Sequence, residues 1–204
     1  MTKRLFKLLS YILHPVFMPF AGVIIVLSVS HLALLPIESK KAILYLMGII
    51  TVFFPLAIIP VLYYLKIITG ATISNRQERL APMFLTSVFY YFGYLVLHKY
   101  SAPLFLQQYM MAVFIAVFIA SVINTKWKIS LHMIGIGGLI GLLSALGHLF
   151  GLRVNLMLMA SIFLAGIIGT GRLYLNEHSP SQIYGGFLLG YIINFGVIVL
   201  LNIF

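Results

Sequence analysis

Long apolar runs dominate the chain, and each is hydrophobic on every face rather than along one stripe. Seven of these runs are near the twenty residues that an α-helix needs to cross the hydrocarbon core of a bilayer. A transmembrane β-strand would alternate apolar and polar side chains, which the stretch from Leu139 to Leu146 does not do. We therefore predict seven membrane-spanning helices, over residues 16–35, 42–65, 80–97, 104–123, 131–150, 154–173 and 182–203.

The composition indicates the same class of protein. Of 204 residues, 62% are hydrophobic and only 8% are charged, whereas about a quarter of the residues in a soluble domain are charged. The apolar runs predict an all-α fold, a multi-pass transmembrane helical bundle of six to seven helices. Because no linker between the runs is long, we predict a single domain over residues 1–204. Three glycine pairs should let helices approach closely in lipid: Gly137/Gly141, Gly147/Gly151 and Gly186/Gly190.

Basic residues outnumber acidic ones by 13 to 3, and they lie at the ends of the apolar runs. This placement favours lipid headgroups or an anionic ligand over nucleic acid. Because successive spans alternate in direction, the N-terminus and the connections 66–79, 124–130 and 174–181 share one side, here called side X, opposite side Y. Side X carries nine of the basic residues, which would place it in the cytoplasm. If four of those nine residues are retained to bind a ligand, five basic residues remain on side X against four on side Y, and this difference does not determine the orientation in the membrane.

Three polar clusters stand out, and all of them fall on side X. They are residues 74–79 (Ser-Asn-Arg-Gln-Glu-Arg), 126–132 (Lys-Trp-Lys-Ile-Ser-Leu-His) and 172–178 (Arg-Leu-Tyr-Leu-Asn-Glu-His). An even number of spans separates each cluster from the next, so all three can face one site. Ionisable groups near membrane depth are costly and usually face a cavity or a partner. The sequence therefore predicts one polar site at side X.

The chemistry that these clusters share is recognition of a phosphate. Arg76, Arg79 and Arg172 offer planar guanidinium groups that match phosphate oxygens. Ser130 and His132 stand at the start of the fifth predicted span, where free backbone N–H groups and the helix dipole favour an anion. The sequence thus supplies both cations and hydrogen-bond donors for a phosphate group.

The two histidines of the clusters, His132 and His178, suit a phosphoryl transfer without a metal ion. One imidazole can attack phosphorus while the other protonates the departing oxygen. The chain has only three acids, Glu38, Glu78 and Glu177, and they are far apart in sequence. This scarcity argues against the carboxylate cage of a two-metal phosphatase. We expect neither a metal ion nor another cofactor.

The clusters resemble the three motifs of the type 2 phosphatidic acid phosphatase superfamily, whose members are membrane lipid-phosphate phosphatases. The third family motif is Ser-Arg-x5-His-x3-Asp, and Arg172 and His178 keep its Arg-x5-His spacing. The second is Pro-Ser-Gly-His, of which Ser130 and His132 keep Ser-x-His. The first is Lys-x6-Arg-Pro, and Arg79 is the best match for its arginine. The resemblance covers roughly residues 72–182, within a motif-bearing core of about 72–204.

The resemblance implies a role for each matching residue. His178 would be the nucleophile that attacks phosphorus, and His132 would be the general acid that protonates the leaving group. Arg79, Arg172 and Ser130 would hold the phosphate. In that family the reaction requires no metal ion.

The chain departs from the family motifs at several positions. Thr72 replaces the lysine of the first motif, and Arg76 is a candidate replacement for the missing cation, as Lys128 is for a further phosphate contact. Gln182 replaces the acid that orients the nucleophilic histidine, and an amide cannot stabilise positive charge on the ring as a carboxylate does. Gln182 is four residues after His178, so if the helix starts at or before His178 both side chains lie on one face, and we expect the Gln182 side chain within hydrogen-bonding reach of that ring.

Two functions follow from this reading. The first is a metal-independent phosphatase, a phosphoric monoester hydrolase of the plasma membrane, that hydrolyses a lipid phosphate or pyrophosphate through a phosphohistidine intermediate. The second is a catalytically weakened relative that binds a phosphate-bearing lipid for transport or as an accessory subunit, and Gln182 favours it. A transporter or channel unrelated to phosphate is a third possibility, for which the sequence has no evident inverted repeat. Membrane lipids are the expected partners, and the oligomeric state is left open.

Several other polar residues have structural interpretations. Residues 1–9 are expected to flank the first helix, and His14 is expected to shape its start together with Pro15 and Pro19. Glu177 is expected to face solvent, because adjacent helical residues point about 100° apart and His178 takes the other direction. Packing or interfacial positions are expected for the remaining histidines: His31, His98 and His148.

Overall fold

A computed structural model describes residues 2–70 and 75–203, so Thr72 and Ser74 lie outside the described residues. The described residues are helical apart from turns and short connections. Within them, seven helical segments are long and apolar enough to cross a membrane, which confirms the predicted multi-pass helical bundle. These segments are Lys3–Val29, Ile37–Tyr64, Leu80–Lys99, Leu104–Asn124, Leu131–Phe150, Asn155–Tyr174 and Pro180–Asn202.

The first span starts earlier than predicted and is broken in the middle. It comprises α1 (Thr2–Ile12), the short 3-10 turn η1 (Pro15–Phe17) and α2 (Met18–Val29). His14 has an extended backbone and caps η1 by accepting the Val16 N–H, so it acts at the turn that precedes α2 rather than at the start of the span. The prediction that residues 1–9 only flank a helix is wrong, since most of them form α1. Residues 31–35, predicted to end the span, instead include the 3-10 turn η2 (His31–Leu34).

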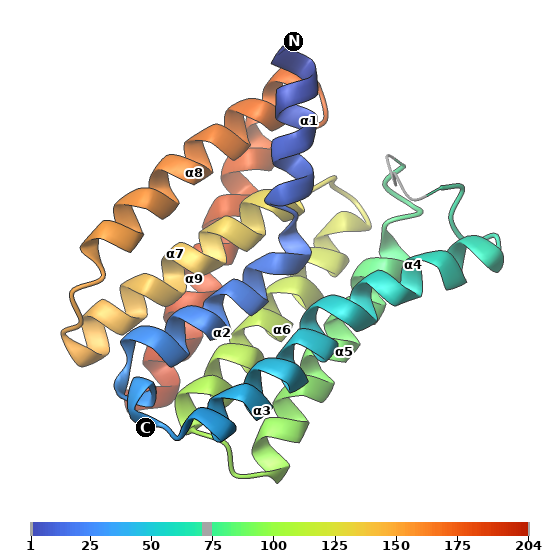
Figure 1. The fold of residues 1–204 in the computed structure, drawn as a ribbon. Helices are drawn as coiled ribbons and strands as arrows, with labels where there is room; N and C mark the ends of the chain where they lie inside the picture. The colour runs from blue at the N-terminus through green and yellow to red at the C-terminus, as the bar shows by residue number, and fades with distance from the viewer. Residues whose placement is uncertain (1, 71–74, 204) are drawn as a thin grey trace.

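α1 leaves the direction of α2 at η1 and lies near the end of α8 (Asn155–Tyr174) (Figure 1). The Phe6 ring packs on Tyr174 with a centroid distance of 5.3 Å. It also covers Gly171, where a Cβ atom would come within 2.8 Å of the Phe6 ring. This contact holds the N-terminal helix at side X, beside the third polar cluster.

The second span also changes geometry part-way along. It runs through α3 (Ile37–Gly48), the π-helical turn η3 (Ile49–Phe53) and α4 (Phe54–Tyr64). Pro55 has no N–H, so it cannot donate to the Thr51 carbonyl one turn earlier, and a π-turn at this point accommodates the loss. The Tyr90 hydroxyl, from α5, lies 3.4 Å from that carbonyl and donates to it.

The remaining spans are α5 (Leu80–Lys99), α6 (Leu104–Asn124), α7 (Leu131–Phe150), α8 and α9 (Pro180–Ile203). α7 and α9 share the most extensive helix contact. Glycines on both helices make it close: a Cβ atom at Gly137 would lie 2.3 Å from the Phe187 carbonyl oxygen, and one at Gly190 would lie 2.1 Å from the Ile134 oxygen. The glycine prediction is therefore confirmed for the pairs on these two helices.

The prediction for the pair Gly147 and Gly151 is wrong. Gly151 ends α7 with a left-handed backbone (φ 60°), which a glycine adopts without steric cost. Gly147 faces Val154 and the connection to α8 rather than another helix. This glycine spacing thus belongs to a helix end, which the sequence pattern does not distinguish from a helix contact.

Candidate functional site

The three polar clusters meet at one end of the bundle, the end where α1 lies. Arg76 donates through its guanidinium group to the Lys126 carbonyl, and the Asn124 amide donates to the Arg76 carbonyl over 3.0 Å. The Ser130 N–H lies 3.4 Å from the Gln182 carbonyl, between the starts of α7 and α9. The described part of the cluster 74–79 therefore contacts the cluster 126–132. That cluster in turn contacts the start of α9, which directly follows the cluster 172–178.

A cavity of about 950 Å³ opens at this end. Arg79, His132 and Arg172, one predicted site residue from each cluster, line it. Ser130 and His178 are not lining residues but are buried, with exposed fractions of 0% and 7%. The other predicted site residues, also outside the lining, are Arg76, Lys128 and Gln182. Polar lining residues that the sequence reasoning did not select as site residues include Lys7, Ser10, His14, Thr86, Glu177 and Asn194.

His178 is held by the hydrogen bond that the sequence predicted. Its Nδ1 lies 3.0 Å from Gln182 Oε1, and the Ser179 N–H donates to the same oxygen over 3.2 Å. A backbone N–H can only donate, so this atom of the Gln182 amide is the oxygen, and the histidine must bring its proton to it. The Nδ1–H tautomer follows, which leaves the lone pair of His178 on Nε2.

The turn between α8 and α9 positions this ring. Asn176 adopts a left-handed backbone (φ 54°), a conformation that asparagine tolerates better than most residues. Its N–H bonds the Leu173 carbonyl over 2.9 Å, which closes the turn after α8. The chain re-enters a helix at Pro180, so His178 lies two residues before α9. Gln182, in the first turn of α9, reaches back to the Ser179 N–H and to His178 Nδ1.

The His178 ring is uncharged at neutral pH, which suits a nucleophile or a hydrogen-bond acceptor. Burial of the ring lowers the pKa of His178 to about 4, and the positive charges of Arg79 and Arg172 act in the same direction. The Gln182 hydrogen bond opposes this change but does not cancel it. At neutral pH the ring is therefore uncharged, with a free lone pair on Nε2.

One acid of the cavity pairs with one of its two arginines. Arg172 forms an ion pair with Glu177, with 3.6 Å between Nη2 and Oε2. The prediction that Glu177 faces solvent is therefore wrong. Its side chain is only 35% exposed, and it lines the cavity. Burial, together with the charge of Arg172, lowers the pKa of Arg79 to about 10, so Arg79 stays charged at neutral pH. With Lys7, three cationic side chains and one anionic side chain line the cavity, and this excess of positive charge favours a negatively charged ligand.

Unpaired polar atoms gather at this site. Among the described residues, four buried side-chain atoms have no hydrogen-bond partner, and three of them belong to predicted site residues: Ser130 Oγ, Arg172 Nε and His178 Nε2. The fourth is Asn124 Oδ1, from the residue that binds Arg76. A buried polar atom without a partner costs about 1–3 kcal/mol, so several such atoms together mark a place where a ligand or ordered water supplies the missing partners.

His132 contacts α1, which the sequence reasoning did not anticipate. Its Nε2–H donates to the Ser10 carbonyl over 3.1 Å. α1 ends at Ile12, and the extended backbone at His14 leaves the Ser10 carbonyl free for this bond. The bond places the proton of neutral His132 on Nε2 and its lone pair on Nδ1. The His14 ring packs edge-on against His132 at a centroid distance of 5.6 Å.

The two remaining basic candidates lie beside the cavity. Lys128 is half-buried, and burial together with the charge of Arg79 lowers the pKa of its amine. Arg76 is committed to the Lys126 carbonyl, as described above. In the described part of the chain, no three histidine, aspartate or glutamate side chains are grouped closely enough to hold a metal ion.

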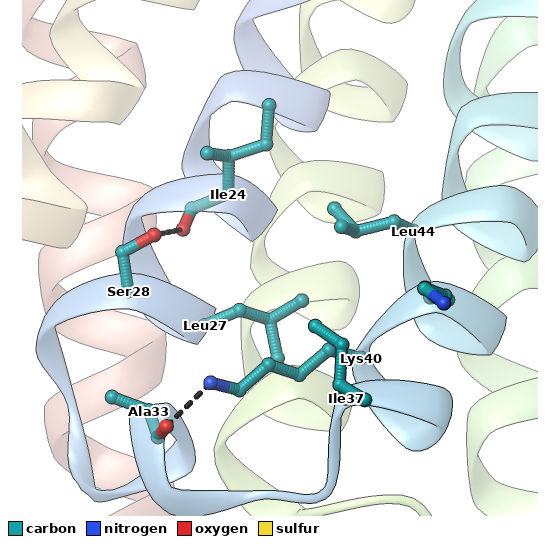
Figure 2. Close-up of a pocket in the computed structure, with 8 residues that line it drawn as sticks. Ile24, Leu27, Ser28, Ala33, Ile37, Lys40 and Leu44 are labelled. Carbon is teal, nitrogen blue, oxygen red and sulfur yellow. Dashed lines mark hydrogen bonds between the residues drawn. The ribbon is translucent and has the colours of Figure 1, made fainter.

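A second cavity, of about 430 Å³, lies at side Y between α2, η2 and α3 (Figure 2). The Lys40 amine donates to the Ala33 carbonyl, and the Ser28 hydroxyl donates to the Ile24 carbonyl over 2.7 Å (Figure 2). None of the unpaired buried atoms of the described residues belongs to this cavity. The third polar group of this cavity, the Lys41 amine, is paired with the Glu38 carboxylate over 3.0 Å, so its polar groups already have partners within the protein.

Comparison of the chain with protein-family models, with curated proteins and with solved structures found no match. The functional argument therefore depends on the geometry of the site at side X and on the motif resemblance.

Proposed function

We propose that the protein is a metal-independent membrane phosphatase that hydrolyses a lipid phosphate or pyrophosphate at side X. The observation that supports this most directly is the group of unpaired buried atoms at Ser130, Arg172 and His178. Ser130 and Arg172 offer donors for phosphate oxygens, and His178 offers a lone pair for phosphorus. The arrangement suits a tetrahedral anion that is both held and attacked.

In the first step, the Nε2 lone pair of His178 attacks phosphorus, and the bond from phosphorus to the lipid oxygen breaks. Gln182 keeps the proton on Nδ1, so that Nε2 is the atom available for the new bond. His132, protonated on Nδ1, gives that proton to the departing oxygen and keeps its Nε2–H bond to Ser10. Arg79 and Arg172 balance the charge that develops on the phosphate oxygens. The products are a lipid alcohol, or a lipid monophosphate from a pyrophosphate, and phosphohistidine.

In the second step, water attacks the phosphohistidine. Neutral His132 accepts a proton from the water on Nδ1, and the phosphorus–nitrogen bond breaks. Inorganic phosphate leaves, His178 recovers its lone pair, and His132 is again protonated for the next cycle.

The test is phosphate release by the purified protein in detergent, from phosphatidic acid and from a polyprenyl pyrophosphate, with and without EDTA. We expect release that EDTA does not change. A His132→Ala variant given radiolabelled 4-nitrophenyl phosphate, whose leaving group departs without a general acid, should accumulate an acid-labile phosphoprotein, because its second step lacks a base. Release that EDTA abolishes and a divalent ion restores would show that the histidine mechanism is wrong.

A second function is favoured by Gln182. An amide orients His178 but does not stabilise an imidazolium, so turnover should be slow, and a non-catalytic binder of a lipid phosphate has the same site. If wild-type protein binds phosphatidic acid in nanodiscs but releases no phosphate from any lipid phosphate, this binding function is the correct one.

A further inference from the structure

The cavity at side X continues far below its polar mouth. Tyr90 and Asn194, both nearly fully buried, belong to its lining. Tyr90 is ten residues, or about 15 Å, from the side X end of α5. Asn194 is fourteen residues, or about 21 Å, from the start of α9. Because the hydrocarbon core of a bilayer is about 30 Å thick, the cavity reaches the middle of the membrane.

Most of the cavity lining below the arginines is apolar, and the amide of the deep Asn194 donates to the Gly190 carbonyl. The apolar lining comes mainly from α4, α5, α6 and α7, and includes Ile59, Met83, Val113, Val117, Ile134 and Leu139. Two tyrosines close the deep end, and their hydroxyls are bound by backbone: Tyr109 donates to the Pro19 carbonyl over 3.2 Å, and Tyr90 to the Thr51 carbonyl. With the hydroxyls engaged, the two side chains contribute mainly aromatic surface to the cavity.

The cavity has an open side that faces lipid. The exposed apolar residues of its lining lie in two places, with Tyr11 (65% exposed) and Phe17 (40%) on α1 and η1, and Leu56 (44%) on α4. Figure 1 shows α1 turning away from α2, while α4 continues along the line of α3. The opening therefore lies between the N-terminal segment and α4, at the level of the membrane rather than only at its surface.

We propose that this cavity binds the hydrocarbon chain of the lipid whose phosphate lies at Arg79 and Arg172, and that the chain enters sideways between η1 and α4. The inference rests on the proposed function for the headgroup. The cavity has a basic entrance at Arg79 and Arg172 that suits an anionic headgroup, and it continues into an apolar interior that suits a hydrocarbon chain. The substrate class is a lipid phosphate with its chain inside the protein, not one that reaches the site with its headgroup alone.

The first test fills the cavity. Thr86→Trp places a large ring among the lining residues of α5, whereas Val88→Trp, two residues along the same helix, changes a 44% exposed position outside the lining. In nanodiscs, Thr86→Trp should lower kcat/KM for hexadecyl phosphate by at least about tenfold and leave that for butyl phosphate unchanged. Val88→Trp should change neither. Equal losses for both phosphates, or no loss for either, would overturn the inference.

A second pair of variants covers the possibility that Thr86→Trp does not fold. Val117→Trp fills the cavity from α6, and Val122→Trp, at a 55% exposed position on that helix, is its control. The same selective loss of hexadecyl phosphate is expected for Val117→Trp. Loss with Val122→Trp alone would contradict a chain site in the cavity.

The last test does not depend on turnover. A hexadecyl phosphate with a photoreactive diazirine in its chain is bound to a His178→Ala variant in nanodiscs, and the adducts are mapped. We expect adducts at Ile59, Val113 and Val117, and few when the probe carries an alcohol in place of the phosphate. Equal labelling by the two probes would refute the phosphate site but keep the chain site. Adducts confined to lipid-facing residues would refute the chain site, even if phosphate release is observed.

Discussion

Two histidine–glutamine pairs lie at opposite ends of the bundle and form the same hydrogen bond. At side X, Nδ1 of His178 and Oε1 of Gln182 are 3.0 Å apart, and at side Y the same atoms of His98 and Gln107 are also 3.0 Å apart. Both glutamine oxygens are identified by a further bond, because the Gln107 amide nitrogen donates to the Ala102 carbonyl over 2.6 Å. The same tautomer therefore exists at both ends, with the lone pair on Nε2.

The surroundings of the two rings differ. His98 is exposed and stacks on Tyr94 at a centroid distance of 5.9 Å, so water can reach its Nε2. His178 is buried among cations, and its Nε2 has no partner. The two cavities also differ in whether their polar groups have partners. In the side Y cavity, Lys40 and Ser28 donate to backbone carbonyls. A hydrogen bond that orients a ring is thus common to both ends, whereas among the described residues the unsatisfied buried polar atoms lie at side X.

The largest effect that separates the two pairs should come from removing each ring. His178→Ala should lower phosphate release by roughly 10⁴-fold or more, because the nucleophile is lost. His98→Ala should leave release within about twofold, since it changes an exposed ring at the other end. Release from phosphatidic acid, measured for both variants at equal amounts of folded protein, checks this. Comparable losses for both histidines would erase the distinction between the two ends.

The next effect concerns the orienting amides. Gln182→Glu keeps the side-chain length and supplies two oxygens, one for Ser179 N–H and one for His178 Nδ1–H. A carboxylate also stabilises the positive ring, so release should rise by about 10- to 100-fold. Gln107→Glu, the matched change at side Y, should have no effect on release. A fall in release with Gln182→Glu would show that the neutral amide is required, as in a binding protein.

The pH dependence should also distinguish His178. Its pKa of about 4 keeps the nucleophile neutral at pH 5 to 7, so the part of the rate that depends on this ring should be constant there and fall about tenfold per pH unit below pH 4. Gln182→Glu should move this fall to higher pH, because the carboxylate raises the pKa of the ring. The pH profile of single-turnover phosphoenzyme formation checks both expectations, and an unmoved profile would contradict the assignment.

The same pKa links stability to pH. The unfolded state, with a histidine pKa of about 6.5, binds more protons than the folded state between pH 6.5 and 4. The contribution of His178 to stability is therefore fully present above pH 6.5 and is lost as the pH falls towards 4. It amounts to about 3 kcal/mol. When the pH is lowered from 7 to 4.5, the melting temperature in detergent should fall less for His178→Ala than for wild-type protein.

The smallest effect is expected at the side Y cavity. Lys40→Met removes the bond to the Ala33 carbonyl, which should lower the free energy of unfolding by about 1 kcal/mol. Phosphate release and phosphatidic acid binding should not change, because no unpaired group lies there. Loss of lipid binding in Lys40→Met would show that side Y holds a ligand site as well.

The sequence by itself determined the membrane helices and the side on which the polar clusters lie. In a bilayer every backbone polar group must be bonded within the chain, so an apolar run of about twenty residues has few alternatives to a helix. Successive crossings then assign each connection to a side. The His178–Gln182 contact was predictable from the sequence because it is local, but its basis differs from the expected one: α9 starts only at Pro180, and Gln182 reaches back from the first turn of that helix.

The tertiary structure decided which polar atoms are satisfied. Ser10 and His132 are 122 positions apart, and their bond exists because α1 ends before Pro15 and folds over the start of α7. No helical spacing encodes such a contact, just as none encodes the Arg172–Glu177 ion pair or the lining position of His14. Burial without a partner depends on everything packed around an atom, and for that reason the unpaired groups of Ser130 and His178 appear only in the assembled bundle.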